Sequence, residues 1–226
     1  RLNPDGDVTK YSQSYNTTFT MTHTFSSRSF YTLKGSYFFR DFNEYTYKDI
    51  LDSRYQHPDS LNTILYAFND GGTNLHRFFR ETNTYLAKFD FTSQVHENHL
   101  VKFGFEGKMD KLEFDDFNLE PKTINNIPVQ PFVPSVPDEN SPNRQLYTAE
   151  PMSASAYIQD KIEFESVIIN IGLRFDYFDS RGQILVDPTD PNIFVPLRNS
   201  VTDAAGNVID LNDLSIAERE PYFYKD

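Results

Sequence analysis

The chain has 226 residues, a net charge of −12 and no cysteine, and 15 % of its residues are aromatic. Its acidity disfavours nucleic acid as a partner, because phosphates would be repelled, and the absence of cysteine excludes disulfides and thiolate metal sites. The length is sufficient for one all-β domain. No stretch reaches the roughly 20 apolar residues that a membrane-spanning helix needs, so a role in a membrane would require β-strands.

The first predicted hairpin comprises residues 15–25 and 31–40. In both segments, large or apolar side chains alternate with polar ones, and this period of two indicates a β-strand with two different faces. The residues on the expected outward face are Tyr15, Thr17, Phe19, Met21, His23, Phe25, Tyr31, Leu33, Gly35, Tyr37 and Phe39. Residues 26–29 are short and polar, which is typical of a hairpin turn.

The second predicted hairpin comprises residues 85–91 and 101–109, joined by a polar turn at 94–98. In its second strand one face carries no charge, and it consists of Val101, Phe103, Phe105, Gly107 and Met109. The opposite face carries charges of both signs, on Lys102, Glu106, Lys108 and Asp110, with Gly104 between them. The chain offers no second layer to bury the apolar face, so we expect lipid to cover it.

The third predicted hairpin comprises residues 154–162 and 167–177, with its turn at 165–166. Its first strand is interrupted by Asp160 on the apolar face, whereas its second strand alternates regularly from Val167 to Tyr177. Each apolar row lasts about the 9 to 11 residues that a tilted strand needs to cross a bilayer.

The connections alternate in length. Three long segments, residues 48–80, 115–151 and 179 to the end, alternate with the three short turns. This pattern places all tight turns at one rim and all long loops at the other, as in outer-membrane barrels with short periplasmic turns. Aromatic residues gather near both ends of the strands, where an interfacial girdle would lie.

Two segments also resemble a known family. Residues 157–178, YIQDKIEFESVIINIGLRFDYF, resemble the barrel hairpin of TonB-dependent outer-membrane receptors, and the matching positions are Tyr157, Gln159, Asp160, Gly172, Arg174 and Asp176. Residues 99–108, HLVKFGFEGK, are similar to another barrel strand of that family, especially in members with a carboxypeptidase-regulatory-like domain. The resemblance implies a closed barrel of about 22 strands around a plug domain.

The expected fold is therefore an all-β, antiparallel transmembrane barrel segment of about six strands, in three hairpins. Residues 1–226 would form a partial barrel domain without a plug domain. The resemblance implies active uptake of a scarce nutrient, such as a ferric siderophore, a vitamin or a glycan, across the outer membrane of a Gram-negative bacterium. It also implies four partners, namely membrane lipid, the plug domain, the energy-transducing protein TonB and the ligand.

The residues proposed for ligand contact are charged, lumen-facing and expected near the outer rim: Arg40, Asp110, Arg174 and Asp176. The alternative is that these charges pair with neighbouring strands or with the plug. No metal site or cofactor is predicted, because the acidic clusters lack the spacing of a fixed calcium loop, and the pair His96 and His99 lacks a third ligand.

The sequence contains no catalytic motif such as Gly-x-Ser-x-Gly or His-Glu-x-x-His, so no enzymatic activity is predicted. The alternative function is a secreted β-sandwich or jelly-roll module that binds carbohydrate. The two readings differ in what covers Phe103, Phe105, Ile169 and Ile171, which would face a second sheet in a sandwich and lipid in a barrel.

Overall fold

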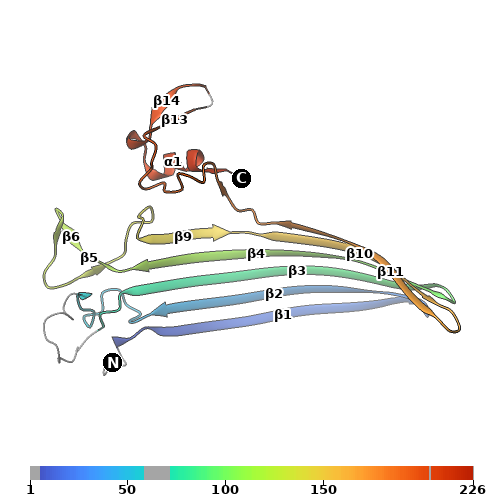
Figure 1. Ribbon diagram of the computed structural model, residues 1–226. Coiled ribbons are helices and arrows are strands. Elements are labelled where there is room, and N and C mark those ends of the chain that lie inside the picture. The colour runs from blue at the N-terminus through green and yellow to red at the C-terminus, as the bar shows by residue number, and fades with distance from the viewer. Residues whose placement is uncertain (1–5, 59–71, 204, 226) are drawn as a thin grey trace.

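The computed structural model describes residues 6–58, 72–203 and 205–225, and one antiparallel sheet dominates it. The sheet consists of three successive hairpins, and their long strands follow one another across the sheet in the order of the chain (Figure 1). The strands, in sheet order, are β1 (Thr9–Ser26), β2 (Ser29–Tyr45), β3 (His76–His96), β4 (His99–Asn118), β10 (Met152–Glu163) and β11 (Ile168–Asp179). A shorter strand, β9 (Arg144–Ala149), pairs with the outer part of β4. The predicted all-β segment of three hairpins is confirmed.

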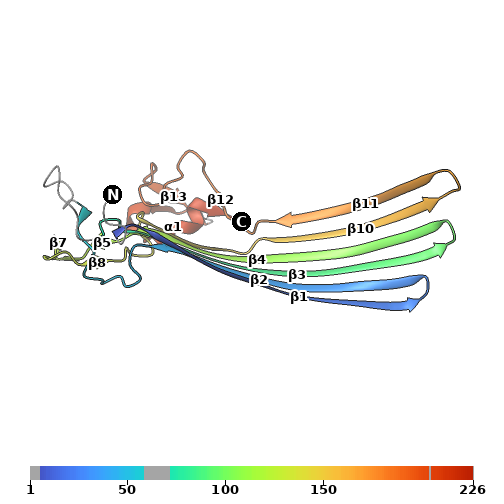
Figure 2. The ribbon, with the colours of Figure 1, turned by 90° about the horizontal axis from the view of Figure 1, so that it is seen from below.

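The turns and loops separate to opposite ends of the sheet (Figures 1 and 2). The three short turns lie at one end, and the long connections lie at the other, as the alternation of their lengths predicts. In an outer-membrane barrel the end with the long connections would be the extracellular end. Of the first long connection, residues 59–71 lie outside the described part of the chain.

The strands extend further toward the long loops than the sequence predicts. The predicted loops 48–80 and 115–151 are too long, because β3 already begins at His76 and β4 continues to Asn118. Here the outward side chains become polar, as at Glu81, Lys111 and Glu113, so the apolar alternation disappears while the backbone pairing continues. The sheet thus extends beyond the apolar band toward the long connections.

The apolar face is a single layer. Phe105, in the middle of this face, and Ile171, nearer the short turns, are 57 % and 64 % exposed. Within the described residues no second sheet covers them, since the remaining strand pairs contain only two or three residues per strand. The sandwich alternative is therefore not favoured, and lipid is the medium that suits this face.

Aromatic side chains mark the outer limit of the apolar band. Tyr15 stacks on Phe39 with ring centroids 4.9 Å apart, and Tyr37 lies 5.1 Å from Tyr85. Two residues beyond Phe39 on β2, toward the long connections, lies Asp41. The carboxylates of Asp41, Glu81 and Glu113 occupy directly opposed positions on β2, β3 and β4. Like charges in this arrangement repel one another unless water solvates them, so this row lies outside the hydrocarbon.

The first two long connections form a small core against the outward face of the upper strands. Its buried residues are Tyr47, Tyr55, Leu75, Phe117 and Leu119. Short strand pairs brace the second connection, and they are β5 (Glu120–Pro121) with β8 (Pro134–Ser135) and β6 (Thr123–Ile124) with β7 (Ile127–Pro128).

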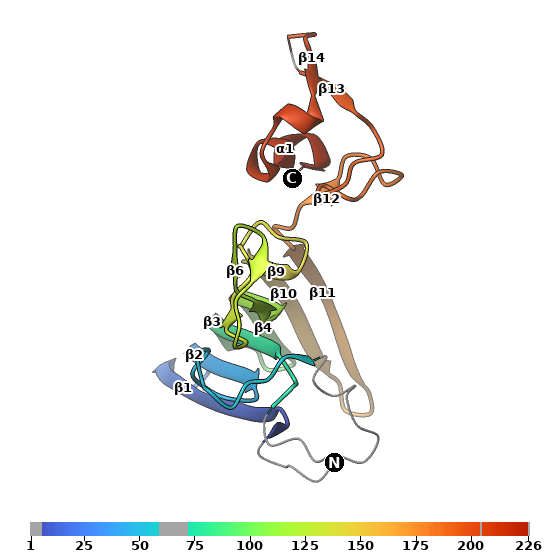
Figure 3. The ribbon, with the colours of Figure 1, turned by 90° about the vertical axis from the view of Figure 1, so that its left-hand side faces the viewer.

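The segment after β11 folds into a compact unit of its own, the C-terminal unit, which Figure 3 shows above the ends of the strands. Its buried core consists of Ile193, Leu211 and Phe223. Its elements are β12 (Ile184–Leu185), β13 (Ser200–Thr202), β14 (Val208–Asp210), the 3₁₀ helix η3 (Leu211–Asp213), the helix α1 (Ile216–Phe223) and β15 (Tyr224–Lys225). In the described part of the chain, no helix is long and apolar enough to cross a membrane.

Candidate ligand-binding face at the outer rim

Two of the four predicted contact residues lie in the outer half of the lumen-facing side. Arg40 on β2 is exposed and stands in register with Ser14 and Thr82. Asp110 on β4 accepts a hydrogen bond from the hydroxyl of Thr84 and pairs with Lys108 at 2.8 Å. The carboxylate of Asp110 is thus already engaged by the sheet, whereas Arg40 faces the open lumen.

The other two predicted residues lie much deeper. Arg174 and Asp176 form an ion pair on β11, with a nitrogen–oxygen distance of 2.8 Å. Arg174 stands in the same row across the sheet as Thr32, which precedes Arg40 by eight residues, or about 27 Å along a strand. The four residues therefore do not form one site.

A row of aromatic side chains lies on the lumen-facing side above Arg40, at the extracellular end. The register of β2, β3, β4 and β9 brings these rings together, and we call them the outer aromatic row: Phe42, Phe78, Phe114 and Tyr147. Their centroids follow one another at 5.7 Å, 5.2 Å and 4.7 Å, the first two contacts edge to face and the last stacked. Such contacts fix the rings in place.

Arg80 adds a positive charge to this row. Its guanidinium lies 5.6 Å from the ring centroid of Phe42 and 6.0 Å from that of Phe78, within the range of a cation–π contact. Arg40 occupies the diagonal position on β2, two residues before Phe42. At the outer edge of the row, His76 contacts Asp116 at 2.8 Å. The face thus offers flat apolar rings beside two guanidinium groups.

This arrangement suits a ligand that presents a ring face together with oxygen acceptors. Tyr147 is the most accessible ring of the row and is 49 % exposed. Stacking on an aromatic ring and hydrogen bonding to a guanidinium are compatible in one ligand, since the rings and the charges lie side by side. The described residues contain no group of three or more His, Asp or Glu side chains that could hold a metal ion.

Sequence reasoning missed this row for a local reason. Phe78 and Phe79 are adjacent, so they point to opposite faces and hide the period of two. Phe114 lies beyond the end of the predicted strand 101–109, and Tyr147 lies inside the predicted loop 115–151. The signal that could have extended the two predicted strands toward the long loops is a ring two residues from an arginine on the same face. It occurs twice, as Arg40 with Phe42 and as Phe78 with Arg80.

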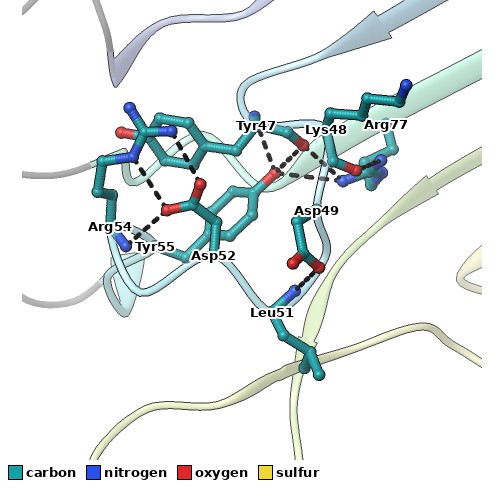
Figure 4. A network of polar contacts seen from close by, with 8 residues as sticks. All are labelled: Tyr47, Lys48, Asp49, Leu51, Asp52, Arg54, Tyr55 and Arg77. Atoms are coloured by element: carbon teal, nitrogen blue, oxygen red, sulfur yellow. Dashed lines mark hydrogen bonds and ion pairs between the residues drawn. The ribbon is translucent and has the colours of Figure 1, made fainter.

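The outward side of the same rim is held by a network around Arg77 (Figure 4). The Arg77 guanidinium donates to the carbonyl oxygens of Tyr47 at 2.9 Å and Lys48 at 3.0 Å, and it is only 4 % exposed. Nearby, hydrogen bonds from the Arg54 side chain lower the pKa of Asp52 to about 2. Burial raises the pKa of Tyr47 above its ordinary value.

Comparison with known proteins agrees with this architecture. The family profile described as TonB dependent receptor-like, beta-barrel, matches residues 1–208. The chain belongs to this TonB-dependent receptor family. Among curated proteins none matches the chain. Members of the family are transport receptors of the outer membrane, so the sheet is a segment of a receptor barrel and its polar face lines the lumen.

Proposed function

We propose that this chain forms part of the wall and extracellular mouth of a receptor that takes up a scarce nutrient. Residues 1–226 serve as a partial barrel domain in the outer membrane of a Gram-negative bacterium. The plug domain and TonB are its partners, and TonB supplies the energy for transport through the plug. The single-layer sheet, with one apolar and one charged face, supports this proposal.

The ligand contacts the outer aromatic row, and this is the observation on which the site proposal depends. A ring of the ligand stacks on Tyr147 or Phe114, while oxygen acceptors pair with Arg80 and Arg40. A glycan and an aromatic siderophore both present rings and oxygens, so both ligand classes suit this face. Asp110 has a supporting role, because its carboxylate already binds Thr84 and Lys108.

Arg174 and Asp176 have a different place in this proposal. They lie on the lumen face about halfway down β11 and are 58 % and 60 % exposed. The deeper lumen is the space that a plug domain fills in this family, so this ion pair faces the plug. The pair contributes to the affinity for the ligand only indirectly.

The test uses the complete receptor in its native outer membrane. Strains are grown on ferric siderophores, cobalamin or oligosaccharides, each as the only source of the nutrient, with and without the gene. Tyr147→Ala should reduce growth on the class that requires the gene and weaken binding about fivefold, which is the loss of a stacking contact worth about 1 kcal/mol.

The matched control is Phe175→Ala, because Phe175 is an aromatic residue on the lipid-facing side and is 69 % exposed. Both variants must reach the outer membrane in equal amounts. If Tyr147→Ala binds the nutrient as well as the natural protein does, the outer aromatic row is not the contact face. If deletion of the gene affects growth on none of these nutrients, the uptake proposal itself is refuted.

A further inference from the structure

The lipid-facing side of the sheet carries an apolar groove of about 760 Å³. Its floor is a row of small residues in direct register on four adjacent strands, namely Gly35, Ala87, Gly107 and Ala154. Neighbouring strands lie about 4.8 Å apart, so this floor is about 14 Å long. We call it the small-residue groove.

Large side chains bound this groove. Phe19 stands in register with Gly35 and closes one end. On the side of the outer rim the walls are Tyr37, Tyr85, Met109 and Met152. Because Tyr37 and Tyr85 belong to the aromatic limit of the apolar band, the groove lies just within the outer half of the hydrocarbon.

The two glycines of the floor are not required by packing within the chain. A Cβ atom at Gly35 or Gly107 would have no neighbour within 4 Å. At Gly104, by contrast, a Cβ atom would lie 2.5 Å from the ring of Tyr157. The space above Gly35 and Gly107 is thus open to a molecule from outside the chain.

A positive charge lines the groove at its outer end. Arg181 follows β11, and its side chain is 44 % exposed. Its guanidinium lies 3.0 Å from the sulfur of Met152 and 3.9 Å from the carboxylate of Glu150. Because the contact with Glu150 is long, much of the guanidinium stays exposed, at the level where lipid head groups lie. An apolar groove that ends at a cation is complementary to an acyl chain that ends at a phosphate.

We propose that the small-residue groove binds one acyl chain of a phosphorylated outer-leaflet lipid, whose phosphate pairs with Arg181. Small residues also permit close approach of another membrane protein. The position of Arg181 favours the lipid, because its contact with Glu150 is long and its side chain is 44 % exposed. A phosphate would add a second anionic partner, whereas a protein surface in this band would be apolar. The proposal depends on the barrel assignment and not on the outer aromatic row.

The experiment uses the complete receptor, purified from outer membranes in mild detergent, and lipid A as the probe. Native mass spectrometry measures how many lipid A molecules each barrel retains. Gly107→Leu fills the groove and should reduce retention at least fivefold. Arg181→Gln should reduce it about threefold. The control is Ala156→Leu, which adds the same side chain one row away, outside the groove, and should leave retention unchanged.

Each other outcome contradicts the proposal. Equal retention by the natural protein and Gly107→Leu shows that the groove does not hold the lipid. Equal losses in Gly107→Leu and Ala156→Leu show that the lipid is bound without selectivity. A change of oligomeric state in Gly107→Leu without loss of lipid identifies a protein partner. Gly35→Leu fills the same groove and replaces Gly107→Leu if that variant fails to fold. Nutrient uptake is measured separately, so failure here leaves the uptake proposal intact.

Discussion

At the scale of single residues, three strands of the lumen face are joined at Gly104. The ring of Tyr157, from β10, lies over Gly104 on β4, and its hydroxyl donates to Asp90 on β3 at 2.7 Å. Any side chain at position 104 would displace this ring, because a Cβ atom there would be 2.5 Å from the ring and 2.8 Å from the carbonyl oxygen of Phe89. Here glycine is required by close approach, and the alternation pattern alone gives no reason for it.

We therefore predict that Gly104→Val destabilises the barrel by about 1–3 kcal/mol, the range for overpacking. The measurement is the temperature at which the full receptor in detergent loses its folded, compact migration on a gel. Gly107→Ala is the control, because the added Cβ atom meets nothing within 4 Å, and it should change stability by less than about 0.5 kcal/mol. Equal effects of the two substitutions would contradict the role assigned to Tyr157.

A second residue-level prediction concerns Arg77, whose buried guanidinium holds two carbonyl oxygens of the first long connection. Arg77→Met removes the Arg77 donor from the carbonyl of Lys48 and leaves the carbonyl of Tyr47 with the hydroxyl of Tyr55 at 3.2 Å. An unsatisfied buried acceptor costs about 1–3 kcal/mol. We expect this connection to become sensitive to protease at the cell surface. Lys48→Met is the matched control, since the side chain of Lys48 is exposed, and it should leave cleavage unchanged. Resistance of Arg77→Met to protease would show that the network does not order the loop.

At the scale of elements, the C-terminal unit is held together by local carboxylate contacts. Asp203 accepts hydrogen bonds from the backbone of Ala205 and Asn207, and Glu218 caps α1 through Ser215. Hydrogen bonds, chiefly from the side chains of Asn207 and Ser215, lower the pKa of both carboxyls below their ordinary values of 3.8 and 4.5. A hydrogen bond from the Thr189 side chain lowers the pKa of Asp187 in the same way.

These shifts give the unit a defined response to acid. A carboxyl whose pKa is lower in the folded state stabilises that state above its unfolded pKa, and the contribution is lost as the pH falls through the folded pKa. We expect residues 184–225 to lose protection from hydrogen exchange as the pH falls from about 4.5 to below 3.8, while the sheet stays protected. Asp203→Asn should weaken this acid response. Protection that is constant down to pH 3 would contradict the prediction.

The elements also show how far the sequence predicts the structure. The period of two identifies all six long strands wherever one face meets lipid, because only there do the two faces differ in polarity. It fails above the band, where Glu81 and Lys111 are as polar as the lumen-facing residues. The outer aromatic row lies there, so the predicted site contained Arg40 without the rings beside it. The sequence also does not predict the cores of the loops, because Tyr47 and Phe117 are 70 positions apart in the chain and come together only in the folded structure.

At the scale of the whole molecule, the sheet separates two media, and a charge should be tolerated on one face and excluded from the other. We predict that Phe105→Lys lowers the amount of folded receptor in the outer membrane, because a lysine facing lipid near the middle of the bilayer costs about 2–4 kcal/mol. Phe105 also contacts Phe103, with ring centroids 6.3 Å apart, and this contact would be lost as well.

The control for this prediction places the same charge at nearly the same depth on the opposite face. Ser155 immediately precedes Ala156, the partner of Phe105, and it stands in register with Glu106 and Asp176 on the lumen side. Ser155→Lys therefore enters a polar, acidic setting and should reach the outer membrane in the normal amount. Fractionation of cells that express the full receptor measures both variants. Equal loss of the two variants would show that the faces do not differ in medium, whereas selective loss of Phe105→Lys requires lipid on the apolar side.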